Sequence, residues 1–297
     1  MIHENILETI WNTPLVKINN LNSNKNVEIY AKIEWINPTW SIKDRIALKM
    51  IEQAEGEWIL SKQKIIIEAT SWNTWIWLAM IWVVKWYKVE IVMSSGVSVE
   101  RRKMIEAFWA TIILTDSKFW TDWAIKKAKD LVKEFPNRYF MPNQYSNEYN
   151  KMAHYKNTGE EIWNQTNWKV DYMVSSLGTS WTIMWTWRAL KEHNPKIKIV
   201  SAHPVEGHYI QGLKNMKEAI VPKIYDPSQI DETVMVETQA AYETTRQIIK
   251  KEGIFVWMSS WAALYAALEI SKNIDSGIIV VIFPDRWEKY LSTSLFD

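Results

Sequence analysis

Residues 65–86, IIIEATSWNTWIWLAMIWVVKW, contain the pattern that decides the fold. The run of β-branched residues at 65–69 predicts a buried strand, because it is short, apolar and followed by polar residues. The polar turn at 70–74 then leads into the apolar segment 75–84, which predicts a helix. A strand followed directly by a helix is the repeating unit of parallel sheets, so this stretch indicates an α/β protein.

The same alternation continues along the chain. Further β-branched runs occur at 27–34, 89–93, 111–115, 170–176, 197–202 and 277–283. Segments with helical periodicity lie between most of them, for example 41–55, 98–108 and 240–252. We therefore predict largely parallel, twisted sheets flanked by helices. A chain of 297 residues can form two lobes, and the polar segment 141–151 is the best candidate for a crossing between them.

The composition disfavours several classes of function. Lys and Arg number 35 and Asp and Glu 34, so the net charge of +1 provides no field that would recruit nucleic acid or an anionic membrane. The chain has no cysteine, which excludes disulfides and thiolate nucleophiles and fits a reducing cytoplasm. The first ten residues lack the pattern of a secretory signal. The apolar run at 75–84 is shorter than the roughly 20 residues of a membrane span.

Familiar catalytic and metal motifs are absent from the sequence. The five histidines show no metal-ligand spacing, so we predict no metal site. We interpret His203 and His208 as loop residues near a pocket. The P-loop, the dinucleotide-binding glycine motif and the nucleophile elbow of serine hydrolases are not found.

Tryptophan is abundant where glycine is scarce. Trp occurs 20 times and Gly 8 times, whereas glycine is usually about 7% of residues. Several tryptophans stand in turn contexts where glycine is expected: Trp11, Trp40, Trp72, Trp75, Trp181, Trp261 and Trp287. Our hypothesis is that the gene uses a codon, UGA being the natural candidate, that its organism reads as glycine and that translation rendered as tryptophan. Trp163 is interpreted as genuine. The alternatives are a tryptophan-rich binding surface and a designed sequence.

One lysine stands in a position that favours chemistry. In NPTWSIKDR, residues 37–45, Ser41 and Asp44 have the spacing of a capping box. Lys43 is therefore predicted in the first turn of a helix, where the helix dipole disfavours a cation and favours the neutral amine of a Schiff-base lysine. The simpler interpretation is an exposed lysine among 35 basic residues.

Three polar turns precede predicted helices: residues 70–74, 178–182 and 259–261. Hydroxyl groups and free backbone amides at a helix N-terminus suit a carboxylate or a phosphate. Each turn could equally be an ordinary helix cap.

Together and in this order, these motifs resemble the cysteine synthase family, which are pyridoxal-phosphate enzymes of fold type II; the segment 285–290 looks most like the cysteine synthase B branch. The similarity extends over nearly the whole chain, with tryptophan written at most of the family's glycines. The resemblance implies two lobes: residues 41–149 as a smaller, mobile lobe that closes on the substrate, and residues 1–40 with 150–297 as a larger lobe that binds the cofactor.

The resemblance also implies individual roles. Lys43 would hold pyridoxal 5′-phosphate as a Schiff base and then act as general base. Asn73 would contact the ring hydroxyl, and Ser259 the pyridine nitrogen. The cofactor phosphate would be bound by Gly178, Thr179, Ser180, Trp181 and Thr182. The substrate carboxylate would be held by Thr70, Ser71, Thr74 and Gln144.

The implied reaction is β-replacement, in which O-acetylserine or O-phosphoserine loses its leaving group and sulfide adds to form L-cysteine. The resemblance also implies a homodimer, with no nucleic-acid or membrane partner. Within the same fold, the alternative is a relative of cystathionine β-synthase or of serine/threonine dehydratase. A non-catalytic binding or regulatory relative is a further alternative, which the presence of Lys43, Asn73 and Ser259 disfavours.

Overall fold

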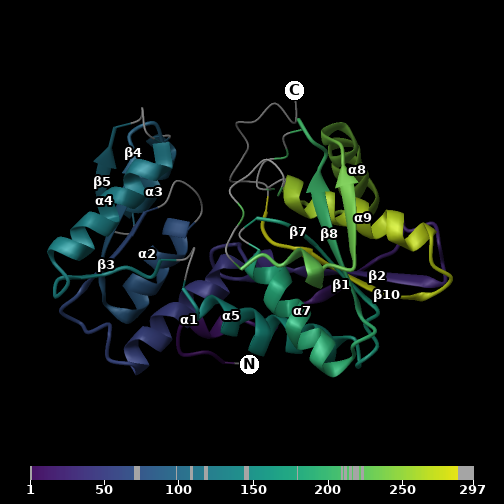
Figure 1. Ribbon diagram of the computed structural model, residues 1–297, viewed down its shortest axis with the longest axis horizontal. Coiled ribbons are helices and arrows are strands. Elements are labelled where there is room, and N and C mark those ends of the chain that lie inside the picture. Colours follow the sequence, from purple (N-terminus) through teal and green to yellow (C-terminus); the bar gives the residue numbers. More distant parts are fainter. Residues whose placement is uncertain are drawn as a thin grey trace. The chain divides into compact units, whose positions relative to one another are not determined.

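The computed structural model describes residues 2–69, 74–97, 99–107, 110–116, 120–143, 147–178, 180–208, 210, 213, 216, 221 and 224–286. The chain divides into two compact units, shown in Figure 1. Unit 1 comprises Met1–Ile10 and Lys43–Asn150, and unit 2 comprises Trp11–Ile42 and Lys151–Asp297. The first ten residues thus group with unit 1, whereas the sequence analysis placed residues 1–40 in the other lobe.

Unit 1 is built on a four-stranded parallel sheet of order β5-β4-β3-β6. The strands are β3 (Ile65–Ala69), β4 (Lys88–Ser94), β5 (Thr111–Thr115) and β6 (Tyr139–Phe140). The helices are η1 (Ile6–Thr9, 3-10), α1 (Lys43–Gly56), α2 (Thr74–Lys85), α3 (Val99–Ala107) and α4 (Trp120–Glu134). Ala124 and Ala128 of α4 pack with Ile67 and Val92 of the sheet, so small helix residues allow α4 to lie close to the strands.

Unit 2 is built on a six-stranded sheet of order β1-β2-β10-β7-β8-β9. Its strands are β1 (Leu15–Ile18), β2 (Val27–Ile33), β7 (Tyr172–Ser176), β8 (Lys198–Pro204), β9 (Glu232–Val236) and β10 (Gly277–Phe283). Only β1 is antiparallel to its neighbour. The helices are η2 (Glu34–Ile36, 3-10), α5 (Asn150–Ala153), η4 (His154–Gly159, a π-helix), α6 (Glu160–Gln165), α7 (Trp181–His193), η5 (Pro227–Gln229, 3-10), α8 (Thr238–Glu252) and α9 (Met258–Lys272).

Helices cover both faces of this sheet, and the alternation of side chains along β10 shows how. Ile279, Val281 and Phe283 belong to the core beneath α8 and α9. Val280 and Ile282 point to the opposite face and pack in the core beneath α6 and α7. Both faces of the strand are therefore apolar, as a parallel sheet between two helical layers requires. The prediction of an α/β fold with largely parallel sheets is confirmed.

Five of the nine described non-glycine residues with positive φ are tryptophans. They are Trp11 (φ 91°), Trp40 (61°), Trp58 (61°), Trp86 (57°) and Trp168 (65°). A bulky residue is a rare occupant of this left-handed region, which glycine adopts without steric cost. Trp58, Trp86 and Trp168 are also 91%, 84% and 65% exposed, so packing does not account for their conformation. We call the backbone at these five positions glycine-type, because its positive φ is one that glycine adopts readily.

Three tryptophans that we interpreted as turn residues lie in helices instead: Trp75 is the second residue of α2, and the other two are Trp181 and Trp261. Trp181 is the first residue of α7, and Trp261 lies in the first turn of α9. Neither is among the described residues with positive φ. Both are buried, and the indole N–H of Trp261 has no hydrogen-bond partner in the described part of the chain. A glycine at these positions would serve close approach rather than a left-handed turn.

Among the residues described, no helix is long and apolar enough to cross a membrane.

Candidate active site

The carboxyl ends of the parallel strands in unit 2 meet at one edge of the sheet, where α/β proteins bind their ligands. The chain leaves β7 at this edge and begins α7 at Trp181. The helix α9 packs on β10 and is joined to it by a short connection at 273–276, so α9 starts at the same edge (Figure 1). The starts of both helices therefore lie where the sequence analysis placed cofactor-binding turns.

The loop that precedes Lys43 is fixed to the same edge. The Trp40 N–H donates to the carbonyl of Asn37 at 2.8 Å, and the Ile42 N–H donates to the carbonyl of Pro284 at 2.9 Å, directly after β10. Ser41 forms an isolated β-bridge with Asp285. Lys43 follows as the first residue of α1, so it lies in the first helical turn as predicted. It is half-buried.

The start of α7 has the features of an anion site. Ser180 is its N-cap, in the left-handed conformation (φ 67°), and makes no side-chain capping bond. The side chain is 4% exposed, and within the described residues its Oγ has no hydrogen-bond partner. The first N–H groups of a helix also lack partners inside the helix and carry partial positive charge. This buried end, with a spare hydroxyl, fits a bound phosphate.

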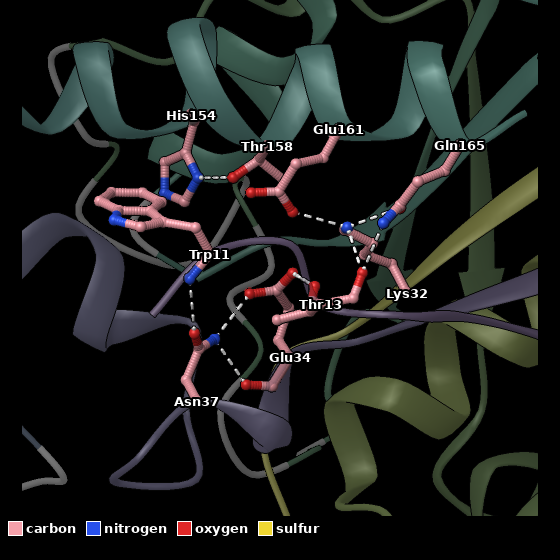
Figure 2. Close-up of polar contacts among 9 residues, drawn as sticks. All are labelled: Trp11, Thr13, Lys32, Glu34, Asn37, His154, Thr158, Glu161 and Gln165. Carbon is pink, nitrogen blue, oxygen red and sulfur yellow. Dashed lines mark hydrogen bonds and ion pairs between the residues drawn. The ribbon is translucent and has the colours of Figure 1, made fainter. Parts of the chain in front are cut away.

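His154 contacts this segment, and the sequence analysis did not identify it. Its Nδ1 lies 3.1 Å from the Thr158 hydroxyl and its Nε2 lies 3.4 Å from the Thr182 hydroxyl. The imidazole is 2% exposed. Figure 2 shows it facing Thr158 from the π-helix η4. Because Thr182 is one of the predicted phosphate ligands, His154 restrains the orientation of a hydroxyl in the anion site.

The first turn of α9 carries two buried hydroxyl groups. Ser259, the residue that the resemblance assigns to the ring nitrogen, is 6% exposed. Ser260 is fully buried, and its Oγ also has no partner among them. A buried hydroxyl without a partner is costly unless a ligand or a water satisfies it. The unpartnered hydroxyl of Ser260 therefore indicates that a ligand binds beside the first turn of α9, where Ser259 also lies.

In unit 1, Glu68 joins the end of β3 to the segment that precedes Gln144. Its carboxylate accepts hydrogen bonds from the Ala69 N–H at 3.2 Å and from the Asn143 N–H at 2.8 Å. Asn143 has a positive φ of 53°. Thr74 begins α2. The remaining predicted site residues, Thr70, Ser71, Asn73, Gln144 and Thr179, lie outside the described residues.

The interpretation of His203 as a loop residue is wrong. His203 lies within β8, paired with Met235 of β9, and is 6% exposed. Burial lowers the pKa of its imidazole, and its Nε2 has no partner among the residues described. The inward-facing position of a central strand accounts for this. His208 follows β8 outside regular structure, where its Nδ1 accepts a hydrogen bond from the Thr238 N–H at 3.2 Å.

Comparison with known proteins shows the family. The sequence model of the family "Pyridoxal-phosphate dependent enzyme" matches residues 6–285. The chain belongs to this family. The cysteine synthase of Aquifex aeolicus is 42% identical to this pyridoxal-phosphate dependent enzyme, over 99% of this chain and 92% of the relative. Cysteine synthase B of Escherichia coli is 37% identical, over 97% and 95%. The crystal structure of O-acetyl serine sulfhydrylase isoform 3 from Entamoeba histolytica has a TM-score of 0.92 and 38% identity, covering 100% of this chain and 92% of that one.

A pyridoxal-phosphate dependent enzyme needs an amine, an anion site for the phosphate and a partner for the ring nitrogen. The described residues provide these groups as Lys43, the start of α7 with Ser180, and Ser259. The Ser180 hydroxyl, which has no partner among the residues that the structure describes, is the observation that supports this fit most directly. The resemblance to cysteine synthases and the assignment of pyridoxal 5′-phosphate as the cofactor are confirmed.

Proposed function

We propose that the protein is a cysteine synthase, which makes L-cysteine from sulfide and an O-activated serine, either O-acetylserine or O-phosphoserine. The observation that carries the proposal is the buried Ser180 hydroxyl, which has no partner within the described residues, in a chain whose relatives of nearly equal length include cysteine synthases. When bound, the cofactor stabilises negative charge at the α-carbon of the substrate.

The residues of the chain divide the work around that cofactor. The Lys43 amine would hold the cofactor through its aldehyde, and its Nζ would accept the α-proton of the substrate. The main-chain amides at 178–182 and the Ser180 hydroxyl hold the phosphate, with Thr182 oriented by His154. Ser259 would donate to the ring nitrogen, and as a neutral donor it would leave that nitrogen unprotonated, which suits loss of a group from the β-carbon.

The residues assigned to the substrate belong to unit 1. Thr70, Ser71, Thr74 and Gln144 hold the carboxylate, and Asn73 contacts the cofactor ring. The main-chain bond from Asn143 to Glu68 supports this grouping, because it ties the residue before Gln144 to the strand that precedes Thr70. We further propose that unit 1 is the mobile lobe that closes on the substrate and that the protein is a cytoplasmic homodimer.

The proposal includes glycine in place of the written tryptophan at 72, 75 and 181. Main-chain amides can hold a phosphate only if its oxygens reach within hydrogen-bond distance, about 3 Å, of the N–H groups. An indole at 181 stands at the first amide of α7. The five tryptophans with glycine-type backbone support recoding of other positions in the same chain.

An assay of cysteine formation from O-acetylserine or O-phosphoserine with sulfide tests the function. The glycine-restored protein is expected to be yellow and active, and Lys43→Ala to be inactive with no cofactor trapped by borohydride. Lys49→Ala, on the same helix and half-buried, is the matched control and is expected to keep both properties. A colourless, inactive protein that binds a partner would support the non-catalytic alternative, and ammonia release from serine or threonine would support the dehydratase.

A further inference from the structure

A buried polar network lies in unit 2 behind the loop that leads to Lys43, and Figure 2 shows it. It contains residues of four elements: the segment before β1, the end of β2, η2 with the turn after it, and α6. Lys32 and Glu34 at its centre are both 0% exposed, and Asn37 is 1% exposed. Burying charged groups is costly unless they are fully bonded, so the network needs a reason beyond packing.

Lys32 holds the far side of the network together. Its Nζ donates to the Glu161 carboxylate at 2.7 Å, to the Gln165 side-chain oxygen at 2.8 Å and to the Thr13 carbonyl at 2.7 Å. The Gln165 amide also donates to the Thr13 carbonyl, at 2.9 Å. The ammonium thus uses all three donors, and Thr13 is fixed against β2 and α6.

Glu34 connects this anchor to the lysine loop. One carboxylate oxygen accepts from the Thr13 hydroxyl at 2.7 Å, and the other accepts from the Asn37 side-chain amide at 3.0 Å. Asn37 also donates to the Glu34 carbonyl at 2.8 Å and accepts from the Trp11 N–H at 3.4 Å. Only the main-chain N–H of Trp11 makes this bond, so it forms equally with glycine at that position.

The lysine loop is therefore held at both ends. Asn37 fixes its start through Glu34, and the Ile42 N–H bonded to Pro284 fixes its end. Within it, the Trp40 N–H to Asn37 carbonyl bond closes a turn in which residue 40 adopts φ 61°. A loop fixed at both ends has few conformations left, and Lys43 is the next residue of the chain.

We propose that Glu34 is a positioning residue: its buried carboxylate holds Asn37, and thereby the loop 37–42, so that the chain enters α1 with the Lys43 amine in a fixed place. This inference rests on the proposed function only for the role of Lys43. The structural role of Glu34, which is to fix the loop 37–42, does not depend on the reaction that the protein catalyses. Glu34 is not expected to touch the substrate or the cofactor.

Hydrogen–deuterium exchange of the cofactor-free protein tests the holding of the loop. Glu34→Gln replaces one acceptor oxygen by a donor that faces either Thr13 or Asn37. The hydrogen-bonded amides of Asn37, Trp40 and Ile42 are therefore expected to exchange at least about ten times faster than in the parent protein. That is the change that a loss of about 1.4 kcal/mol of local stability gives. Thr13→Val, which removes a single hydroxyl, is the milder variant and is expected to give a smaller change at the same amides. Glu28→Gln, at an exposed carboxylate of β2, the strand that precedes Glu34, is the matched control and is expected to give none.

Steady-state kinetics of the loaded enzyme gives the second readout. A misplaced reacting group costs on the order of 100-fold in rate, so kcat is expected to fall by about that factor in Glu34→Gln. KM for the activated serine is expected to stay near the parent value, because the residues assigned to the substrate carboxylate belong to unit 1. Faster exchange throughout unit 2, including β7 and β8, would overturn the proposal, as would local exchange with unchanged kcat. Should the parent protein itself form no cysteine, the proposed function fails, and the exchange experiment still decides whether Glu34 holds the loop.

Discussion

Replacing the exposed left-handed tryptophans by glycine is expected to stabilise the protein. Trp58, Trp86 and Trp168 have φ values of 61°, 57° and 65° and are 91%, 84% and 65% exposed. The left-handed conformation costs an L-residue about 1–2 kcal/mol. Glycine avoids this cost, but it makes the unfolded chain more flexible, which offsets about 0.5–1 kcal/mol of the gain. We therefore expect a gain of about 0.5–1 kcal/mol for each of the three substitutions and about 2 kcal/mol for all three.

The three substitutions remove few side-chain contacts. Among the described residues, the one side-chain hydrogen bond that the three indoles make is the exposed bond from Trp168 Nε1 to Asn164, at 3.3 Å. Urea unfolding followed by far-ultraviolet circular dichroism measures the change without depending on indole fluorescence. The midpoint is expected to rise in each single variant with an unchanged slope.

Trp163→Gly is the matched control for a tryptophan in ordinary helical backbone. Trp163 lies in α6, and its ring stacks on His193 with centroids 4.9 Å apart. Glycine inside a helix costs about 1 kcal/mol from propensity alone, so the control is expected to lower the midpoint. If the three left-handed variants lower it as the control does, the glycine-type assignment of these positions is wrong.

Three further predictions follow from buried groups. Lys32→Met is expected to lower the free energy of unfolding by about 3–5 kcal/mol, because Glu161 keeps a buried charge without its cation; adding Glu161→Leu is expected to restore most of it in the same urea assay. His203→Leu is expected to lose less stability than the parent between about pH 7 and pH 5: burial lowers the folded pKa of His203, so the unfolded chain binds the proton first, near pH 6.5, and stability falls as the pH drops. Trp181→Gly is expected to increase cofactor affinity at least tenfold, as measured by absorbance titration, and equal affinity would remove the steric argument at that position.

Continuous apolar runs were sufficient to predict the central strands. The runs at 65–69 and 277–283 coincide with β3 and β10, and the run at 89–93 lies within β4. The edge strand β5 was also predicted, from the apolar run at 112–114. The strands β1 and β9 were not predicted, because they lie at the edges of their sheet and bury few residues, and β6 is only two residues long. Sequence patterns report apolar runs, so a short edge strand is predicted only where, as in β5, such a run stands out from its neighbours.

The candidate site was predictable where local chemistry determines it. Lys43 was placed in the first turn of α1 from the spacing of its neighbours, and Ser180 at the start of α7 from the strand before it. His154 was missed, because the π-helix that presents it depends on tertiary packing: a Cβ at Gly159 would lie 2.5 Å from the Ala189 Cβ of α7. Glu34 was missed because a buried carboxylate in a turn looks, in sequence, like an exposed one.

Peptide mass spectrometry of the borohydride-reduced protein, purified from the cells that naturally make it, tests the central claim most directly. Trypsin does not cleave after a modified lysine, so the cofactor adduct is expected on a peptide spanning residues 33–45, attached to Lys43 and with glycine read at position 40. An adduct on a different lysine, or no adduct on a protein that still forms cysteine, would contradict the account.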